Sequence, residues 1–149
     1  MARFKYRMQS ILDLKIQLEE AARQRFSLAQ MKLNQEEEVL ESLRARKRFY
    51  EEEGVRLRQD ALKVQEIIDN KAAILRMDDY IAEQQEVVRL AEDALERERK
   101  ALTEVMTERK SHEKLRERAL EEFMKEEAAS ESKAIDELTS YRYTINQEG

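Results

Sequence analysis

The chain has almost none of the residues that turn a polypeptide. It contains 149 residues and no proline, and of its two glycines one is Gly54 and the other is the last residue. Sandwiches, barrels and doubly wound α/β domains need glycine or proline at frequent intervals between their elements. Charged residues make up 41% of the chain and hydrophobic residues another 41%, a composition typical of coiled coils and long helices. The sequence therefore predicts an all-α protein.

Hydrophobic residues in the first part of the chain repeat with coiled-coil spacing. Alternate steps of four and three residues from Ala22 meet an apolar or aromatic side chain at eleven of fourteen positions; this first run is Ala22, Phe26, Ala29, Leu33, Glu36, Leu40, Leu43, Lys47, Tyr50, Gly54, Leu57, Ala61, Val64 and Ile68. We call such positions the seam. Upstream, Phe4, Met8, Ile11 and Leu18 extend the seam only through a stutter between Leu18 and Phe26, which would locally unwind a supercoil.

A second run extends from Ile74 to Phe123, with ten apolar residues at fifteen positions. Its exceptions gather at Arg109, His112 and Arg116, where we expect a weaker core. Two runs of seam predict a long antiparallel two-helix coiled coil, an α-hairpin, formed by residues 1–149 as a single domain.

The turn of the hairpin is predicted at about 56–64, with the first helix over about 4–57 and the second over about 64–142. Gly54 weakens a helix, and Asp60 supplies a side chain able to cap a new one. Asp69-Asn70 and Asp78-Asp79 are competing sites, but a turn there would strand apolar neighbours in a loop. The predicted turn places Tyr50 near Lys71 or Ala72. It also leaves an overhanging C-terminal helix beyond about residue 120.

Composition excludes several classes of function. The chain has no cysteine, and its single histidine, His112, cannot build a zinc site alone, so we expect no metal and no cofactor. A nucleophile, a positioned base and a pocket do not occur together, so we expect no enzyme. The sequence has no stretch suited to a signal peptide or a membrane span. These exclusions favour a protein that acts through its surface.

One basic stretch is the strongest candidate for binding nucleic acid. It comprises Arg44, Arg46, Lys47 and Arg48, followed by Arg56 and Arg58. Glu41 and the run Glu51 to Glu53 flank it, and the chain as a whole carries a net charge of −5. Because nucleic-acid binding needs a net basic face, we expect no nucleic-acid partner.

Three segments, in order, resemble the family of the flagellar export protein FliJ. They are the opening Phe4-Lys-Tyr-Arg-Met-Gln-Ser-Ile-Leu-Asp-Leu-Lys15, the later Lys110-Ser-His-Glu-Lys-Leu-Arg-Glu-Arg118, and Glu131-Ser-Lys-Ala-Ile-Asp-Glu137. The resemblance covers nearly the full length of the chain. It implies a non-enzymatic stalk or coupling component of the flagellar type III protein export apparatus, similar to the gamma subunit of rotary ATPases.

The resemblance also implies partners and a location. The partners are the hexamer of the export ATPase FliI, the cytoplasmic domain of the export gate protein FlhA, and export chaperones. The implied location is cytoplasmic, peripheral at the cytoplasmic face of the inner membrane at the flagellar base. A hairpin of this kind is expected to be a monomer when free. A two-stranded coiled coil is thin enough to enter the axial opening of a ring ATPase.

Two groups of residues are predicted to bind these partners. Lys133, Asp136 and Glu137 lie in the overhang and have no partner within the hairpin, so we expect the end carrying both termini to enter the ring. Leu43, Phe49, Tyr50, Met77 and Tyr80 lie toward the turn, where the resemblance places the contact with the export gate. Leu43, Tyr50 and Met77 are also seam positions, whereas Phe49 and Tyr80 lie off the seam and are the better candidates.

A different class of function stays open at this stage. The whole chain could be one continuous helix that pairs with a second copy, as a structural dimerising scaffold. Size and shape in solution distinguish this scaffold from a hairpin.

Overall fold

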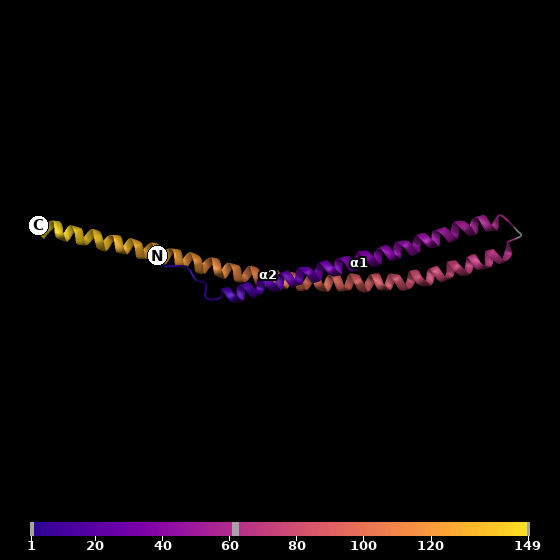
Figure 1. Cartoon of the computed structure of the whole chain (residues 1–149), viewed down its shortest axis with the longest axis horizontal. Helices are drawn as coiled ribbons and strands as arrows, with labels where there is room; N and C mark the ends of the chain where they lie inside the picture. The colour runs from indigo at the N-terminus through magenta and orange to yellow at the C-terminus, as the bar shows by residue number, and fades with distance from the viewer. Residues whose placement is uncertain (1, 61–62, 149) are drawn as a thin grey trace. The chain divides into compact units, whose positions relative to one another are not determined.

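Two long helices make up the chain in a computed structural model that describes residues 2–60 and 63–148 (Figure 1). Helix α1 spans Gln9–Arg58 and helix α2 spans Val64–Glu148, and the described residues contain no strand. The fold is the predicted all-α hairpin, and the break between α1 and α2 excludes one continuous helix. No helix within the described ranges is both long and apolar enough to cross a membrane.

The connection between the helices falls within the range that the sequence predicts for the turn. Backbone hydrogen bonds from Gln59 N to the Arg56 carbonyl and from Lys63 N to the Asp60 carbonyl close the ends of α1 and α2. Arg56 and Arg58 occupy the last turn of α1, where positive charge complements the helix dipole. The competing turn sites, Asp69-Asn70 and Asp78-Asp79, lie within α2.

Contacts divide the chain into two units, each of which pairs a segment of α1 with a segment of α2. The hairpin unit comprises residues 21–103 and the terminal unit comprises residues 1–20 with 104–149. The sequence predicts a single domain over residues 1–149, whereas the contacts divide the chain into these two units. Each unit is described by itself below.

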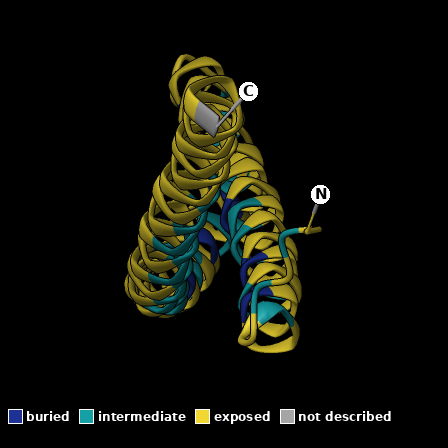
Figure 2. Ribbon diagram, turned by 90° about the vertical axis from the view of Figure 1, so that its left-hand side faces the viewer, coloured by how far each residue is buried: buried dark blue, intermediate teal, exposed yellow. Residues whose placement is uncertain are grey.

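The core of the hairpin unit is apolar. Leu33 and Leu40 of α1 form one buried cluster with Val88, Ala91 and Leu95 of α2, and Phe26, Ala29 and Ile81 pack against it. Buried and half-buried residues lie on the sides of the helices that face each other, and the other faces are exposed (Figure 2). Burial of each leucine is worth about 2 kcal/mol, so this cluster holds the pairing together.

The seam is confirmed along most of both helices. Every position of the first run from Ala22 to Leu57 is buried or half-buried, and so is every position of the second run from Ile74 to Phe123. Val64 and Ile68 are exposed, contrary to the prediction, because α1 ends at Arg58 and the seam of α2 begins instead at Ile67 and Asn70. Ala61 lies outside the described residues.

The predicted stutter upstream of Phe26 is wrong. Ile11 and Leu18 are exposed, whereas Leu12 and Glu19 are buried, with relative exposures of 3% and 6%. Positions 12, 15, 19, 22 and 26 continue the four-three spacing without interruption. The error arose from following the apolar residues, because the seam here accepts the charged side chains of Lys15 and Glu19.

The first helix begins at Gln9, later than the predicted start near residue 4. Residues 2–8 are not helical, and Gln9 N donates a hydrogen bond to the Tyr6 carbonyl. Gln9 lies beside Arg116, and Phe4 lies against Phe123, so five residues of this segment span seven residues of α2. An extended chain covers more than twice the rise of a helix per residue, which allows Phe4 to reach that far.

Helix α2 also continues beyond the predicted end, to Glu148. Phe123 is half-buried against Phe4, so the overhang begins a few residues later than expected. Every residue from Ala128 to Gln147 is exposed. We call residues 128–147 the tail.

Candidate interaction surfaces

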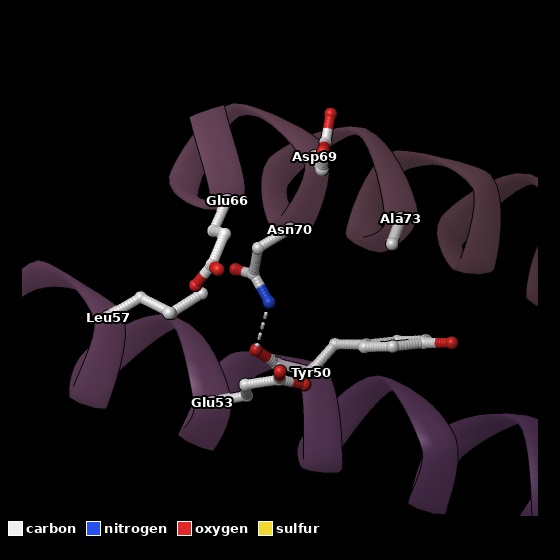
Figure 3. Close-up of a pocket in the computed structure, with 7 residues that line it drawn as sticks. All are labelled: Tyr50, Glu53, Leu57, Glu66, Asp69, Asn70 and Ala73. Carbon is white, nitrogen blue, oxygen red and sulfur yellow. Dashed lines mark hydrogen bonds between the residues drawn. The ribbon is translucent and has the colours of Figure 1, made fainter. Parts of the chain in front are cut away.

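Asparagine 70 joins α2 to the backbone of α1 near the turn. Its side chain is buried, and its Nδ2 donates a hydrogen bond of 2.8 Å to the carbonyl oxygen of Tyr50 (Figure 3). A β-carbon built on Gly54 would lie 2.5 Å from Asn70 Oδ1, closer than real side chains approach. A side chain at this position would therefore have to displace the Asn70 amide, and Gly54 lies inside α1, four residues before the helix ends. The sequence flagged both residues, but only as turn signals.

An open hollow of about 250 Å³ surrounds the hydrogen bond between Asn70 and Tyr50, which we call the Asn70 clamp. Its lining consists of Tyr50, Glu53, Leu57, Glu66, Asp69, Asn70 and Ala73 (Figure 3). Three carboxylates stand around it, and the described residues include no group of three His, Asp or Glu side chains arranged to hold a metal ion.

The predicted gate-binding residues differ in exposure. Met77 is buried, with a relative exposure of 7%, and Leu43 and Tyr50 are half-buried seam residues. Phe49 and Tyr80 are exposed, at 55% and 48%, and face solvent. The ring centroid of Phe49 lies 5.9 Å from that of Tyr50, in an edge-on arrangement. Of the five predicted gate-binding residues, Phe49 and Tyr80 are the exposed ones and can offer an aromatic ring to a partner.

Charged residues on the same part of the molecule largely pair with one another. Lys47 Nζ lies 2.7 Å from Asp78 Oδ1, and its hydrogen bond to Asp78 raises the pKa of Lys47. Arg48 forms an ion pair with Glu41. Glu36 accepts hydrogen bonds from Lys32 and Gln84, which lower the pKa of Glu36. Two cations of the basic stretch are thus neutralised locally.

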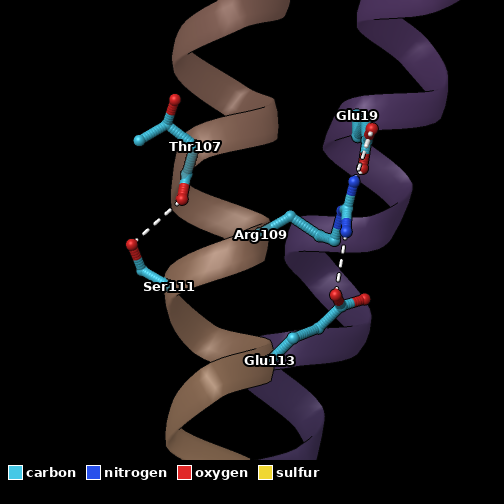
Figure 4. Close-up of polar contacts among 5 residues, drawn as sticks. All are labelled: Glu19, Thr107, Arg109, Ser111 and Glu113. Atoms are coloured by element: carbon cyan, nitrogen blue, oxygen red, sulfur yellow. Dashed lines mark hydrogen bonds and ion pairs between the residues drawn. The ribbon is translucent and has the colours of Figure 1, made fainter.

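The seam of the terminal unit includes charged residues beside apolar ones such as Leu12. Arg109 forms ion pairs with buried Glu19, at 2.6 Å from Nε to Oε2, and with Glu113, at 2.8 Å from Nη1 (Figure 4). These hydrogen bonds raise the pKa of Arg109, with Glu19 as the larger cause. The expectation of a weaker core at Arg109, His112 and Arg116 corresponds to this substitution of ion pairs for hydrophobic contacts.

Further polar pairs extend this seam on both sides. Lys15 Nζ donates to Glu108 Oε2 at 2.9 Å, and this hydrogen bond lowers the pKa of Glu108. Arg116 Nε donates to Gln9 Oε1 at 2.9 Å, and the Arg116 guanidinium lies 5.5 Å from the ring centre of Phe4. His112 is half-buried, and its Nδ1 has no hydrogen-bond partner among the described residues.

The tail carries the second group of predicted binding residues. Lys133, Asp136 and Glu137 are exposed, and none forms an ion pair within the described part of the chain. Large apolar side chains are exposed beside them, namely Ile135, Leu138, Tyr141, Tyr143 and Ile145. The sequence prediction singled out the charges of the tail and omitted these apolar residues, although their spacing was readable.

The fold and surfaces define a coiled-coil hairpin with exposed aromatic rings at Phe49 and Tyr80 in the hairpin unit and a helical tail, exposed from residue 128 to 147, in the terminal unit. A family model for the flagellar FliJ protein matches residues 4–148. The chain therefore belongs to the FliJ family, a family of flagellar type III export components.

Individual relatives agree with this assignment. The flagellar FliJ protein of Bacillus subtilis (strain 168) is 26% identical over 145 residues, which cover 95% of this chain and 97% of that protein. A putative YscO homolog, CT670 from Chlamydia trachomatis, has a similar solved structure, with a TM-score of 0.64, 21% identity and 99% coverage of both chains. The second comparison supports the fold of the hairpin alone.

Proposed function

We propose that this chain is a non-enzymatic stalk that couples the export ATPase to the export gate of the flagellar type III apparatus. The observation that carries the proposal is the tail, a helical segment whose residues are all exposed from Ala128 to Gln147. A helix of this length extends about 30 Å, and a single helix is narrow enough for the opening of a ring. The chain works at the cytoplasmic face of the inner membrane, at the flagellar base.

The tail and the turn region have separate partners in this proposal. Charges at Lys133, Asp136 and Glu137 contact the hexamer of the ATPase FliI. Phe49 and Tyr80 contact the cytoplasmic domain of the gate protein FlhA, because exposed aromatic rings are frequent hot spots of protein interfaces. Export chaperones are further partners, and nucleic acid is not.

Charge reversal in the tail tests the ATPase contact. Asp136→Lys with Glu137→Lys should reduce stimulation of ATP hydrolysis by purified FliI about tenfold, because two partner contacts become repulsive. The matched control is Glu83→Lys with Glu92→Lys, which reverses two exposed charges on the hairpin unit. Stimulation that is unchanged by the tail substitutions would remove the tail from the mechanism.

The gate contact is tested on the aromatic residues. Phe49→Ala with Tyr80→Ala should weaken binding to the FlhA cytoplasmic domain by about 2 kcal/mol or more, measured by calorimetry. Leu75→Ala is the control, because Leu75 is more exposed than either ring, at 66%. Equal effects of the two changes would contradict a specific aromatic contact.

A further inference from the structure

The tail carries a second coiled-coil stripe that no part of the described chain covers. Positions 124, 128, 131, 135, 138, 142 and 145 follow the four-three spacing. Five of these are apolar, namely Met124, Ala128, Ile135, Leu138 and Ile145, and the other two are Glu131 and Arg142. All seven side chains are exposed. We call these positions the tail stripe.

The tail stripe is not a continuation of the seam that pairs α2 with α1. The seam passes through Ala119 and Phe123, whereas the tail stripe begins at Met124, one residue out of step. One residue corresponds to a rotation of about 100° around the helix. The stripe therefore lies on a different face of α2 from the one that packs on the N-terminal segment.

The stripe is complementary to itself when two copies run in opposite directions. Antiparallel pairing about the midpoint between Asp136 and Glu137 places Ile135 opposite Leu138, Ala128 opposite Ile145, and Glu131 opposite Arg142. Between residues 128 and 145 every apolar layer then meets an apolar layer, and each of the two charged layers joins an acid to a base; Met124 lies outside the paired length. Neither Glu131 nor Arg142 forms an ion pair in the described part of its own chain.

From this register we propose that the tail is an interaction surface for a second copy of this chain, paired in antiparallel orientation. The positions that flank the central layers are uncharged, namely Ser132, Ala134, Thr139 and Tyr141, so no like charges meet there. Asp136 and Glu137 point outward from the pair. A parallel pair in register would instead place Glu131 against Glu131 and Arg142 against Arg142, which is repulsive.

The pairing is short and therefore weak. Residues 128–145 make about five helical turns, and two charged layers interrupt the apolar ones. Such a contact buries less surface than the roughly 1,200–2,000 Å² of stable protein interfaces. Association is expected to depend on concentration, with monomers at low concentration and antiparallel pairs at high concentration.

A charge swap tests the proposed contact with the full-length chain. Sedimentation equilibrium should show self-association of the unaltered protein, and Glu131→Arg or Arg142→Glu alone should lower the association constant about tenfold or more, because like charges then meet twice in each pair. The double variant Glu131→Arg with Arg142→Glu should restore association, because acid again meets base. Lys133→Glu, outside the stripe, is the matched control and should leave association unchanged.

Several results would overturn the proposal. These are a protein that remains monomeric up to millimolar concentration, single variants that associate like the unaltered chain, or a double variant as weak as the single ones. Restored association in the double variant cannot be attributed to general loss of folding. Circular dichroism of each variant verifies its helix content.

Spin labels distinguish antiparallel from parallel pairs. The chain has no cysteine, so one introduced cysteine gives one label per copy. Antiparallel pairing places residue 126 beside residue 147 of the other copy, so labels at Glu126→Cys should be separated along the axis by about 30 Å, and labels at Asp136→Cys by only a few ångströms. Equally short distances at both sites would indicate parallel pairing and contradict the proposed register.

Discussion

Near the turn, the identities of Gly54 and Asn70 follow from one close contact between α1 and α2. Gly54 has no side chain because the amide of Asn70 occupies the space that a β-carbon would need. The same amide donates a hydrogen bond from its Nδ2 to the Tyr50 carbonyl oxygen. A glycine costs about 1 kcal/mol in a helix interior, so its presence here reflects packing and not the start of a turn.

A double-mutant cycle tests that interpretation. Gly54→Ala should gain little or destabilise the unaltered protein, because the new methyl group displaces Asn70. The same change in an Asn70→Ala background should stabilise by about 1 kcal/mol, since the helix-propensity gain is no longer opposed. Urea unfolding followed by circular dichroism measures both steps. Equal effects in the two backgrounds would mean that the residues are not coupled.

The seam at the scale of the element changes character between the two units. A buried cluster of leucine, valine and alanine lies on it in the hairpin unit, whereas in the terminal unit Glu19, Arg109 and Lys15 take seam positions beside apolar residues such as Leu12. The two kinds of seam respond differently to the loss of one side chain. A lost methylene leaves a cavity, whereas a lost partner leaves a desolvated charge.

Replacing Arg109 tests the charged seam. Arg109→Met should destabilise the protein more than the loss of an exposed ion pair does, because the buried carboxylate of Glu19 loses the two hydrogen bonds that Arg109 donates to it. Glu19→Met with Arg109→Met should recover most of that loss, since apolar residues of similar volume replace the pair. Chemical unfolding and amide exchange of residues 9–20 provide the measurements.

Arg89 is the matched control for this series. It forms ion pairs with Glu86 and Asp93, but all three side chains are more than half exposed. Arg89→Met should therefore destabilise the protein much less than Arg109→Met does. A loss as large as that of Arg109→Met would show that burial of the pair does not decide its contribution.

The sequence predicts the fold and most of the seam because hydrophobic spacing in long helices is a local signal. Leu33, Leu40, Val88 and Leu95 were identified as core residues from spacing alone. It misplaced the seam at Ile11 and Leu18 because a charged residue such as Glu19 is buried only when a distant partner, Arg109, is opposite it. The Asn70 clamp was missed for the same reason, since no local pattern shows the carbonyl that it binds.

At the scale of the whole molecule, some residues pack α1 against α2 and the residues of the tail do not. Ala128 to Gln147 are all exposed, and the described hydrogen bonds of this segment are internal to α2, from Thr144 to Ser140 and from Gln147 to Tyr143. The tail is therefore expected to add helix content without adding stability to the paired helices. The tail is also the proposed contact both for the ATPase ring and for a second copy of the chain. A tail that is paired with another copy is therefore not available to the ring.

Truncation tests this division. A chain ending at Glu127 should lose helical ellipticity in proportion to the residues removed, and its thermal midpoint should change by no more than about 2 °C. A chain ending at Glu122 also loses Phe123, whose ring centroid lies 5.4 Å from that of Phe4, and should be less stable by about 1 kcal/mol. A large drop in the midpoint of the chain that ends at Glu127 would show that the tail supports the fold.

The charged seam of the terminal unit has a mechanical consequence. Hydrophobic layers tolerate a slip of one heptad, because one leucine resembles the next. Such a slip would move Lys15 from Glu108 to face Ala101 or Leu115 and leave an ammonium group against apolar side chains. The polar pairs therefore oppose sliding of the two segments and fix their register.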